Sequence, residues 1–336
     1  MKKALVTGGC GFVGRHLVSR LLSLGYHVTI VDNFYSGSGF IPLENWPENL
    51  STNNKSNQLI FHKTDCRTFF KENNDYFDDV YHLAAVVGGR LVIEREPLAV
   101  GTDLSIDADF FYWLTQLTKK PGKVHYFSSS AAYPVIHQGV ENNRILNEDD
   151  IDFSSGLIGK PDLTYGWSKL TGEYLAKTYF DLYNSPIICY RPFSGFGEDQ
   201  DLTYPFSSII KRCMITPVGE NVLVWGSGKQ SRDFVYIEDC ITLICNYTQQ
   251  INDASAINIS TGIGTNFNEL ASKVLSILGK SNPITNTSDK PEGVFYRVGS
   301  IDLQHKHGFK ERTALNNGIE LAIEYFKKLG VAVASK

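Results

Sequence analysis

Two reactive side chains, the phenol of Tyr165 and the amine of Lys169, stand four residues apart in this sequence. Residues i and i+4 share one face of a helix, so a helix here would place the ammonium beside the phenol. A nearby positive charge lowers the pKa of a phenol, which makes Tyr165 a candidate proton acceptor. Such a base can take the proton of a hydroxyl group while a hydride leaves the same carbon. The pair therefore indicates oxidation and reduction of an alcohol.

A glycine-rich segment, residues 7–14, follows a short apolar run and precedes a helical pattern. In a strand–loop–helix unit, Gly8 allows a tight turn, Gly11 lets the backbone approach a diphosphate, and Gly14 lets the helix pack closely on the strand. A helix N-terminus also offers free N–H groups and a positive dipole end to an anion. We therefore predict a dinucleotide site formed by Gly8, Gly11, Phe12, Val13 and Gly14.

A carboxylate at the end of the second expected strand indicates which dinucleotide binds. Asp32 can accept both hydroxyls of an adenosine ribose and would repel a 2′-phosphate, which predicts NAD over NADP. Asp65 ends the third strand and is a candidate acceptor for the adenine amino group. Small residues after the fourth strand are expected under the cofactor. The further predicted contacts are Asn33, Asp65, Cys66, Leu83, Ala84 and Ala85.

Composition excludes several classes of partner. The net charge of −4 over 336 residues argues against nucleic acid or an anionic membrane surface. No run of about 18 apolar residues exists, so no membrane-spanning segment is expected, and the apolar start reads as a buried strand rather than a signal peptide. The six cysteines are scattered and the histidines lack metal spacing. We expect a cytoplasmic protein without a metal.

Short apolar runs alternate with helical patterns over about the first 190 residues, as a parallel sheet requires. Strands are expected at 3–7, 27–31, 59–62, 79–83, 123–128 and 186–191. Helices are expected near 11–24, 103–118 and 164–183, and later near 206–213, 237–248 and 266–278. Residues 33–58 are rich in Gly, Ser, Asn and Pro and read as an irregular insertion.

These patterns predict an α/β fold, a Rossmann-type doubly wound parallel sheet with a smaller C-terminal substrate-binding lobe. The expected division is an NAD-binding domain at 1–193 and a mainly substrate-binding lobe at 194–336, with some segments returning to the first domain. The helices at 103–118 and 164–183 are apolar on more than one face. This predicts a homodimer through their outer faces, the alternative being a fully buried helix in a monomer.

Together these residues resemble the extended short-chain dehydrogenase/reductase family, in particular its nucleotide-sugar epimerase and dehydratase branch. The resemblance runs from about residue 3 to about residue 326. Besides the glycine loop, Asp32 and the Tyr165–Lys169 pair, it rests on segments 82–85, 128–130, 191–192, 225–234 and 291–297. It implies a domain that binds NAD, a lobe that binds a nucleotide diphosphate sugar (GDP- or UDP-linked), and commonly a dimer.

The resemblance implies that Ser129 hydrogen-bonds the sugar hydroxyl that is oxidised, while Lys169 holds the nicotinamide ribose. The next two positions carry acid–base residues in the dehydratases; here they are Ser130 and Ala131. Ala131 cannot transfer a proton, so β-elimination and carbanion epimerisation lack their usual acid or base. Our leading hypothesis is an NAD-dependent epimerase of carbohydrate biosynthesis, which forms a transient 4-keto sugar and returns the hydride to C4.

Segments 84–89 and 133–134 are similar to GDP-mannose 3,5-epimerase and GDP-fucose synthase, and segment 291–297 is similar to the 3,5-epimerase. They leave open a GDP-sugar 3,5-epimerase-like enzyme or a 4-keto oxidoreductase, whose acid or base would be Asp199, Asp201 or Tyr204. A 4,6-dehydratase is disfavoured by Ser130 and Ala131. A non-catalytic dinucleotide-binding scaffold is the alternative from another class, but it would need no Tyr–Lys pair.

The substrate diphosphate requires cations, and the guanidinium fork of arginine suits phosphate oxygens. Arg232 and Arg297 are the predicted diphosphate contacts, and Arg90 is predicted to face the substrate. Two positions depart from the family pattern, since Ser194 and Asp103 stand where this branch commonly has asparagine. The predicted substrate-binding residues are Ser129, Ser130, Arg90, Ser194, Arg232 and Arg297.

Overall fold

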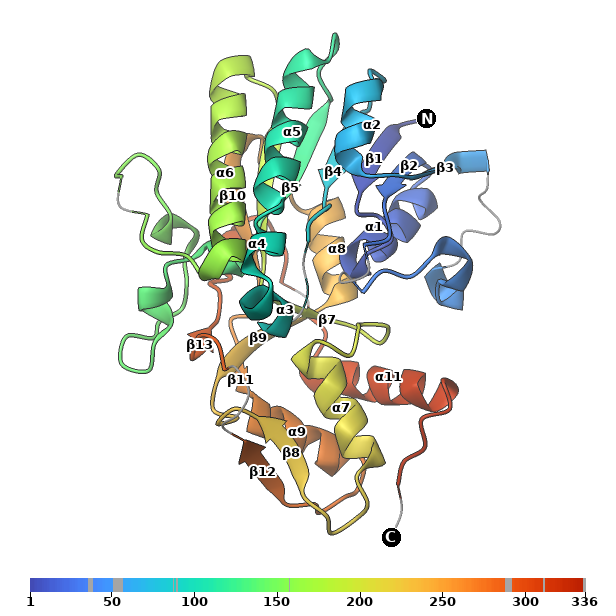
Figure 1. Cartoon of the computed structure of the whole chain (residues 1–336), viewed down its shortest axis with the longest axis vertical. Helices are drawn as coiled ribbons and strands as arrows, with labels where there is room; N and C mark the ends of the chain where they lie inside the picture. Colours follow the sequence, from blue (N-terminus) through green and yellow to red (C-terminus); the bar gives the residue numbers. More distant parts are fainter. Residues whose placement is uncertain are drawn as a thin grey trace.

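The computed structural model describes residues 1–35, 39–50, 57–86, 88, 90–156, 158–287, 292–310 and 312–334. Three residues on which the resemblance partly rests, Val87, Gly89 and Pro291, lie outside them. The described chain forms a parallel sheet with helices on both faces and a smaller lobe beyond one edge of the strands (Figure 1). The predicted Rossmann-type α/β fold is confirmed.

Seven parallel strands form the central sheet, in the order β10-β6-β5-β4-β1-β2-β3. β1, β4, β5 and β6 are buried along nearly their whole length, because helices cover both faces of the sheet. The carboxyl ends of all these strands meet at one edge, where the candidate site lies. The strands are β1 (Lys3–Thr7), β2 (His27–Asp32), β3 (Leu59–Lys63), β4 (Asp79–His82), β5 (Lys123–Phe127), β6 (Ile187–Pro192) and β10 (Asp253–Ile259).

Two groups of helices cover the sheet. One group, α1 and α8, shares a hydrophobic core on one face. The other group, α2, α5 and α6, packs on the opposite face, and Figure 1 shows α5 and α6 side by side. The helices of this domain are α1 (Phe12–Ser23), α2 (Cys66–Glu72), α3 (Arg90–Arg95), α4 (Pro97–Val100), α5 (Asp103–Gln116), α6 (Leu163–Tyr183), α8 (Ile237–Asn246) and α10 (Asp302–Lys306).

The smaller lobe has a core of its own, between three helices and two small sheets. Its helices are α7 (Pro205–Ile215), α9 (Phe267–Ile277) and α11 (Leu315–Lys328). Its strands are β7 (Ser194–Phe196), β8 (Val222–Trp225), β9 (Ser231–Tyr236), β11 (Gly264–Asn266), β12 (Ile284–Thr287) and β13 (Tyr296–Arg297). β10 and α8 return from this half of the chain to the central domain. The division at residue 193 stays a prediction.

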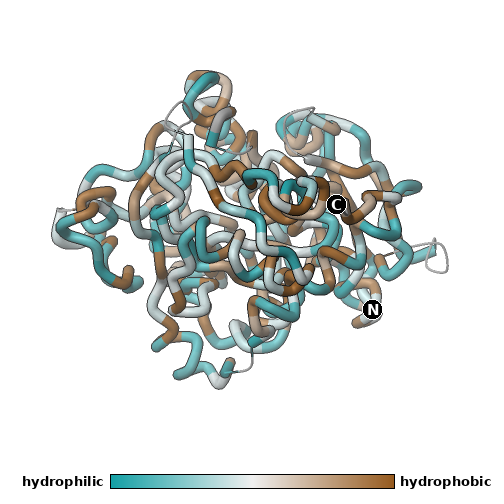
Figure 2. The backbone as a smooth tube through the Cα atoms, turned by 90° about the horizontal axis from the view of Figure 1, so that it is seen from below, coloured by the Kyte–Doolittle hydropathy of each residue, from teal (hydrophilic) through white to brown (hydrophobic). Residues whose placement is uncertain are grey.

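Hydrophobic and hydrophilic residues are interleaved along the backbone (Figure 2). Within the described ranges, no helix is both long enough and apolar enough to span a bilayer. Residues 33–58, expected as an irregular insertion, include short 3-10 helices at Leu43–Asn45 and Glu48–Leu50 in their described part.

Candidate active site

A cavity of about 560 Å³ opens where the carboxyl ends of the central strands face the smaller lobe. Ligands of doubly wound sheets bind at this edge, and the volume lies within the usual range for small-molecule sites. Every predicted site residue lines the cavity except Ser130, which is buried at the start of a short 3-10 helix. The roles assigned to these residues, that of Ser130 included, stay predictions.

The loop between β1 and α1 leaves room for a bound group. Gly8 has a φ of +70°, a conformation that side chains rarely adopt. A Cβ atom on Gly14 would collide with the Gly8 carbonyl oxygen, so the helix could not approach the strand this closely. Gly11 precedes α1 and no side chain caps the helix, which leaves its first N–H groups to a bound anion. This cradle fits the diphosphate of a dinucleotide.

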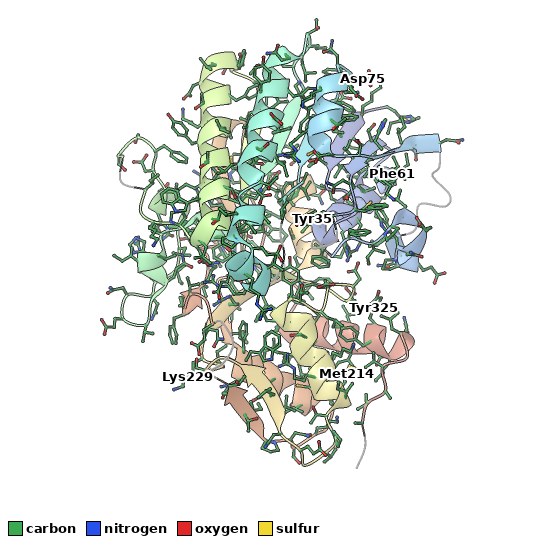
Figure 3. All side chains as sticks on the ribbon, in the orientation of Figure 1. Tyr35, Phe61, Asp75, Met214, Lys229 and Tyr325 are labelled. Atoms are coloured by element: carbon green, nitrogen blue, oxygen red, sulfur yellow. The ribbon has the colours of Figure 1, made fainter. Side chains whose placement is uncertain are left out.

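Asp32 is fixed at the end of β2. One carboxylate oxygen accepts the backbone N–H of Cys10 and the other accepts that of Phe34, each at 2.9 Å. Burial raises the pKa of Asp32, and the two N–H donors oppose this shift. Each oxygen keeps a further acceptor position, so the carboxylate fits a ribose diol. Tyr35, labelled in Figure 3, also lines the cavity.

Asp65 lies on the cavity wall, but its carboxylate already has partners. It caps α2 by accepting the Arg67 backbone N–H at 2.9 Å, and it accepts the Arg67 side chain at 3.0 and 2.7 Å. These hydrogen bonds lower the pKa of Asp65. The adenine contact expected of Asp65 would have to share the carboxylate with Arg67.

Tyr165, Lys169 and Ser129 come together on one wall of the cavity. α6 carries the phenol and the amine on one face, as expected for residues four apart. Ser129 follows β5, its hydroxyl accepts the Ala131 backbone N–H at 3.1 Å, and it is close enough to the Tyr165 phenol to act toward a lower pKa of that group. Lys169 is 2% exposed. The three groups that sequence reasoning selected for catalysis are therefore neighbours.

The electrostatics of Tyr165 differ from the expectation. Burial raises the pKa of the phenol, Lys169 lowers it, and Asp103 raises it. Lys169 acts in the expected direction, but the net pKa of Tyr165 lies above its ordinary value. The lysine itself stays charged: burial lowers its pKa, while Asp107, Tyr165 and Asp103 raise it to a higher net value.

A buried polar network lies beside Lys169 and acts on its ammonium through the charge of Asp107. Asp107 accepts the Tyr126 hydroxyl at 2.6 Å and pairs with the His82 imidazole at 3.2 Å. His82 in turn contacts the Thr7 hydroxyl at 2.8 Å, at the start of the glycine loop. Sequence reasoning missed this network. Its signal was the spacing of Asp103 and Asp107, one helical turn apart in a helix rich in apolar residues.

A second group missed by sequence reasoning is Asp162, the residue before α6. Arg90 donates from Nη1 to both carboxylate oxygens of Asp162 at 2.9 Å, and Arg297 donates from Nη2 at 2.8 Å. Gln138 accepts the Nε of Arg297 at 2.6 Å. One carboxylate thus holds two of the predicted substrate-binding arginines. Its only sequence signal was a position three residues before Tyr165.

Arg232 is the least neutralised of the three arginines. It donates to the backbone carbonyls of Ser231 and Val294 at 2.8 and 2.9 Å, and no ion pair to it is found among the described residues. Burial lowers its pKa to about 9, and the charges of Arg297 and Arg90 act in the same direction. An entering anion would relieve this repulsion. The cluster therefore fits a diphosphate.

The acid–base candidates of the alternative hypotheses lie in the loop after β7, and they differ in whether they face the cavity. Asp199 does not line the cavity, because Arg15 and His16 bind it in a buried ion pair at 2.5 and 2.9 Å. Tyr204 does line the cavity, and burial raises its pKa. Ser194 lines the cavity at the start of β7. No cluster of three or more metal-ligating side chains occurs in the part of the chain that the structure describes.

Comparison with known proteins agrees with this geometry. The model of the "NAD dependent epimerase/dehydratase family" matches residues 4–260. UDP-N-acetyl-alpha-D-glucosaminuronate decarboxylase of Bacillus cytotoxicus is 27% identical over 92% of this chain and 87% of its own. GDP-mannose 3,5-epimerase 1 of Oryza sativa subsp. indica is 26% identical over 96% and 81%.

A solved structure is similar over nearly the whole chain. UDP-glucuronic acid 4-epimerase of Bacillus cereus, crystallised with UDP-glucuronic acid and NAD, has a TM-score of 0.79 and 26% identity, and the match covers 97% of this chain and 99% of that one. The predicted cofactor, NAD, and the predicted class, an NAD-dependent nucleotide-sugar epimerase, are confirmed at the level of the family. The chain belongs to the NAD dependent epimerase/dehydratase family.

Proposed function

We propose that this enzyme inverts C4 of a nucleotide diphosphate sugar through a transient 4-keto sugar. The observation that carries the proposal is the convergence of Tyr165, Lys169 and Ser129 beside Ala131. Among the described residues, Ala131 stands where the dehydratases carry an acid–base residue, so this wall offers a base for one hydroxyl without their usual acid for eliminating another. The nearest carboxylate along the chain, Asp162, is held by two arginines, which keep its pKa low against the effect of burial. It is therefore a poor proton donor.

Each residue has a distinct task in this mechanism. Ser129 orients the C4 hydroxyl, and Tyr165 receives its proton and later returns it. Tyr165 must be a phenolate to receive this proton, and the Lys169 ammonium stabilises that phenolate before the proton is taken and after it is returned, while Asp107 holds the ammonium in place. The glycine loop and Asp32 would hold NAD, which would supply reversible hydride transfer at C4 when bound. Return to the opposite face of the 4-keto sugar inverts the configuration.

We further propose that the diphosphate lies against Arg232 and Arg297. An anion there would contact the arginine that lacks a carboxylate partner in the described structure. The nucleotide is proposed to be UDP, which the names of the B. cytotoxicus and B. cereus proteins support. The name of the rice relative supports GDP as the alternative.

The test is product analysis with UDP-glucose, UDP-glucuronic acid, UDP-N-acetylglucosamine and GDP-mannose. The proposal expects one of them to reach equilibrium with its C4 epimer, without net formation of NADH. Loss of water or carbon dioxide from the sugar, or stoichiometric NADH, would refute it. A parallel reaction with Tyr165→Phe shows whether the conversion belongs to this site.

A homodimer is proposed through the outer faces of α5 and α6, which lie side by side in Figure 1. Several large apolar side chains are exposed there, among them Leu104, Tyr112, Trp167, Tyr174 and Leu182. Such a surface favours pairing with a second copy. Trp167→Asp should convert a dimer to a monomer in sedimentation analysis, and a monomeric wild type would refute the proposal.

The cytoplasmic location expected from the cysteines stays a prediction.

A further inference from the structure

Asp103, the first residue of α5, has a buried carboxylate, and only one of its two oxygens accepts a hydrogen bond from a described residue. It is 1% exposed, and its Oδ1 accepts the Val86 backbone N–H at 2.5 Å. Its Oδ2 is buried and has no hydrogen-bond partner among the described residues. An ionised oxygen in this state costs free energy that a protonated one does not. Burial accordingly raises the pKa of Asp103 to about 7, although Lys169 and the Val86 N–H oppose the shift.

α5 packs on α6, and Asp103 is close enough to Tyr165 and Lys169 for its charge to act on both. Asp103 and Asp107 are one helical turn apart, and both interact with the Lys169 ammonium. The two differ in their partners, because Tyr126 and His82 occupy the oxygens of Asp107. Burial raises the pKa of Asp107, but Lys169, His82 and Tyr126 together lower it to a net value below the ordinary one, so Asp107 stays ionised. Asp103 is the carboxylate of this pair that can exchange a proton near neutral pH.

The charge of Asp103 acts on the phenol in one direction. An ionised Asp103 raises the pKa of Tyr165 directly, and it also compensates the positive charge that favours the phenolate. A neutral Asp103 does neither. The other groups around it are fixed in charge near neutral pH, since burial lowers the pKa of His82 and raises that of Tyr126.

We propose that Asp103 is a positioning residue that sets the proton affinity of the Tyr165 phenol. Its ionised carboxylate engages the Lys169 ammonium and opposes the phenolate, whereas its neutral form leaves the ammonium to Tyr165. This inference rests on the proposed role of Tyr165 as the base.

Asp103→Asn tests the inference, because asparagine keeps an acceptor for the Val86 N–H and the same size while removing the charge. The ascending limb of the pH–rate profile should move to lower pH by about one unit. Asp181→Asn removes the same charge from an exposed ion pair on α6 and should leave the profile in place. An ascending limb that stays at its wild-type pH in Asp103→Asn, or moves upward, would overturn the inference.

A direct titration separates this inference from the proposed function. Protein labelled with ¹³C at the tyrosine ζ carbon reports each phenol, and Tyr165→Phe assigns the signal of Tyr165. In the wild type, that signal should change near pH 7 as Asp103 titrates, and in Asp103→Asn this step should disappear. A step that behaves so in a protein without epimerase activity would refute the function alone. Absence of the step in the wild type would overturn the inference.

Stability gives a further readout that needs no activity. The raised pKa of Asp103 means that the folded state loses stability as pH rises from about 4 toward 7, the range between the ordinary and the folded values. Asp103→Asn lacks this loss. Its melting temperature relative to wild type should therefore be higher at pH 8 than at pH 4.5. An equal difference at both pH values would contradict the inference.

Discussion

The phenol of Tyr165 is the single group on which the proposed proton transfer depends. Tyr165→Phe keeps the packing of α6 and removes the hydroxyl that Ser129 contacts. Turnover should fall by about 10²- to 10⁴-fold, the usual contribution of a general base. NAD should remain bound, since Asp32 and the glycine loop are unchanged. Tyr174→Phe, on the exposed side of the same helix, is the control. Near-normal turnover in Tyr165→Phe would contradict the assignment.

Asp32 is predicted to select NAD over NADP. Asp32→Asn removes the charge that repels a 2′-phosphate but keeps one carbonyl acceptor for the N–H groups of Cys10 and Phe34. The ratio of NAD affinity to NADP affinity should fall by about tenfold or more. Calorimetric titration with both dinucleotides measures this ratio. Asp65→Asn, also on the cavity wall, should leave it unchanged, and an unaltered ratio in Asp32→Asn would exclude the ribose contact.

At the scale of single residues, sequence motifs correctly predicted many of the residues that line the cavity. They did not predict the buried carboxylates that pair with these residues or shift their pKa values. The glycine loop and the Tyr165–Lys169 pair are local patterns, so their placement follows from the chain itself. Asp162 was missed because its partners, Arg90 and Arg297, lie 72 and 135 residues away. The raised pKa of Tyr165 was missed for a similar reason. It depends on burial and on Asp103, which spacing along α6 does not show.

Among the elements, α1 is anchored to the smaller lobe through His16. The imidazole lies between Asp199, which follows β7, and Glu238 of α8, at 2.9 and 3.0 Å. Burial lowers its pKa, but the two carboxylates raise it to a higher net value. A raised histidine pKa gives stability that is complete below about pH 6.5 and is lost as pH rises through the folded value.

His16→Gln should therefore flatten the pH dependence of stability. The melting temperature of the wild type should fall more between pH 6 and pH 9 than that of His16→Gln. Arg20→Gln is a matched control, because it removes another side chain that binds the same Glu238, at 3.0 Å, and leaves the imidazole in place. Parallel curves for wild type and His16→Gln would show that the imidazole does not carry charge in the folded state.

The expected strands agree with the observed ones to within two residues, because buried parallel strands are short apolar runs bounded by polar residues. The elements that were not expected are short or mixed in character. α2 has seven residues, and β10 begins with exposed, partly polar residues whose place in the sheet comes from pairing with β6. α11 is amphipathic, and its apolar face is defined by the lobe against which it packs.

At the scale of the whole molecule, the proposed substrate contacts both parts of the chain, because the arginines predicted to bind it come from the central domain and from the smaller lobe. Arg297→Ala should raise KM for the nucleotide sugar by about 10- to 100-fold, since a hydrogen bond to a charged group contributes about 1.5–3 kcal/mol. Binding of NAD should be unaffected. Initial rates over a range of substrate concentrations measure the effect. Arg144→Ala, which removes an exposed arginine, should leave KM unchanged.

A KM that is unaltered in Arg297→Ala would place the diphosphate elsewhere.

The two-part architecture itself was predictable, since the alternation of strands and helices stops near residue 194. The meeting of Arg90, Arg232 and Arg297 at the substrate site was expected only through the family resemblance, because they come from α3, β9 and β13. Only the folded arrangement shows that two of them share one carboxylate while the third has none in the described structure.

The measurement that tests the central claim most directly is turnover of the accepted nucleotide sugar in deuterium oxide, followed by proton NMR of the product. If C4 is oxidised and reduced by a hydride that never leaves the site, the C4 epimer forms with no deuterium at C3, C4 or C5. Deuterium at C3 or C5 would show that those carbons lose a proton to solvent, and would contradict hydride return at C4.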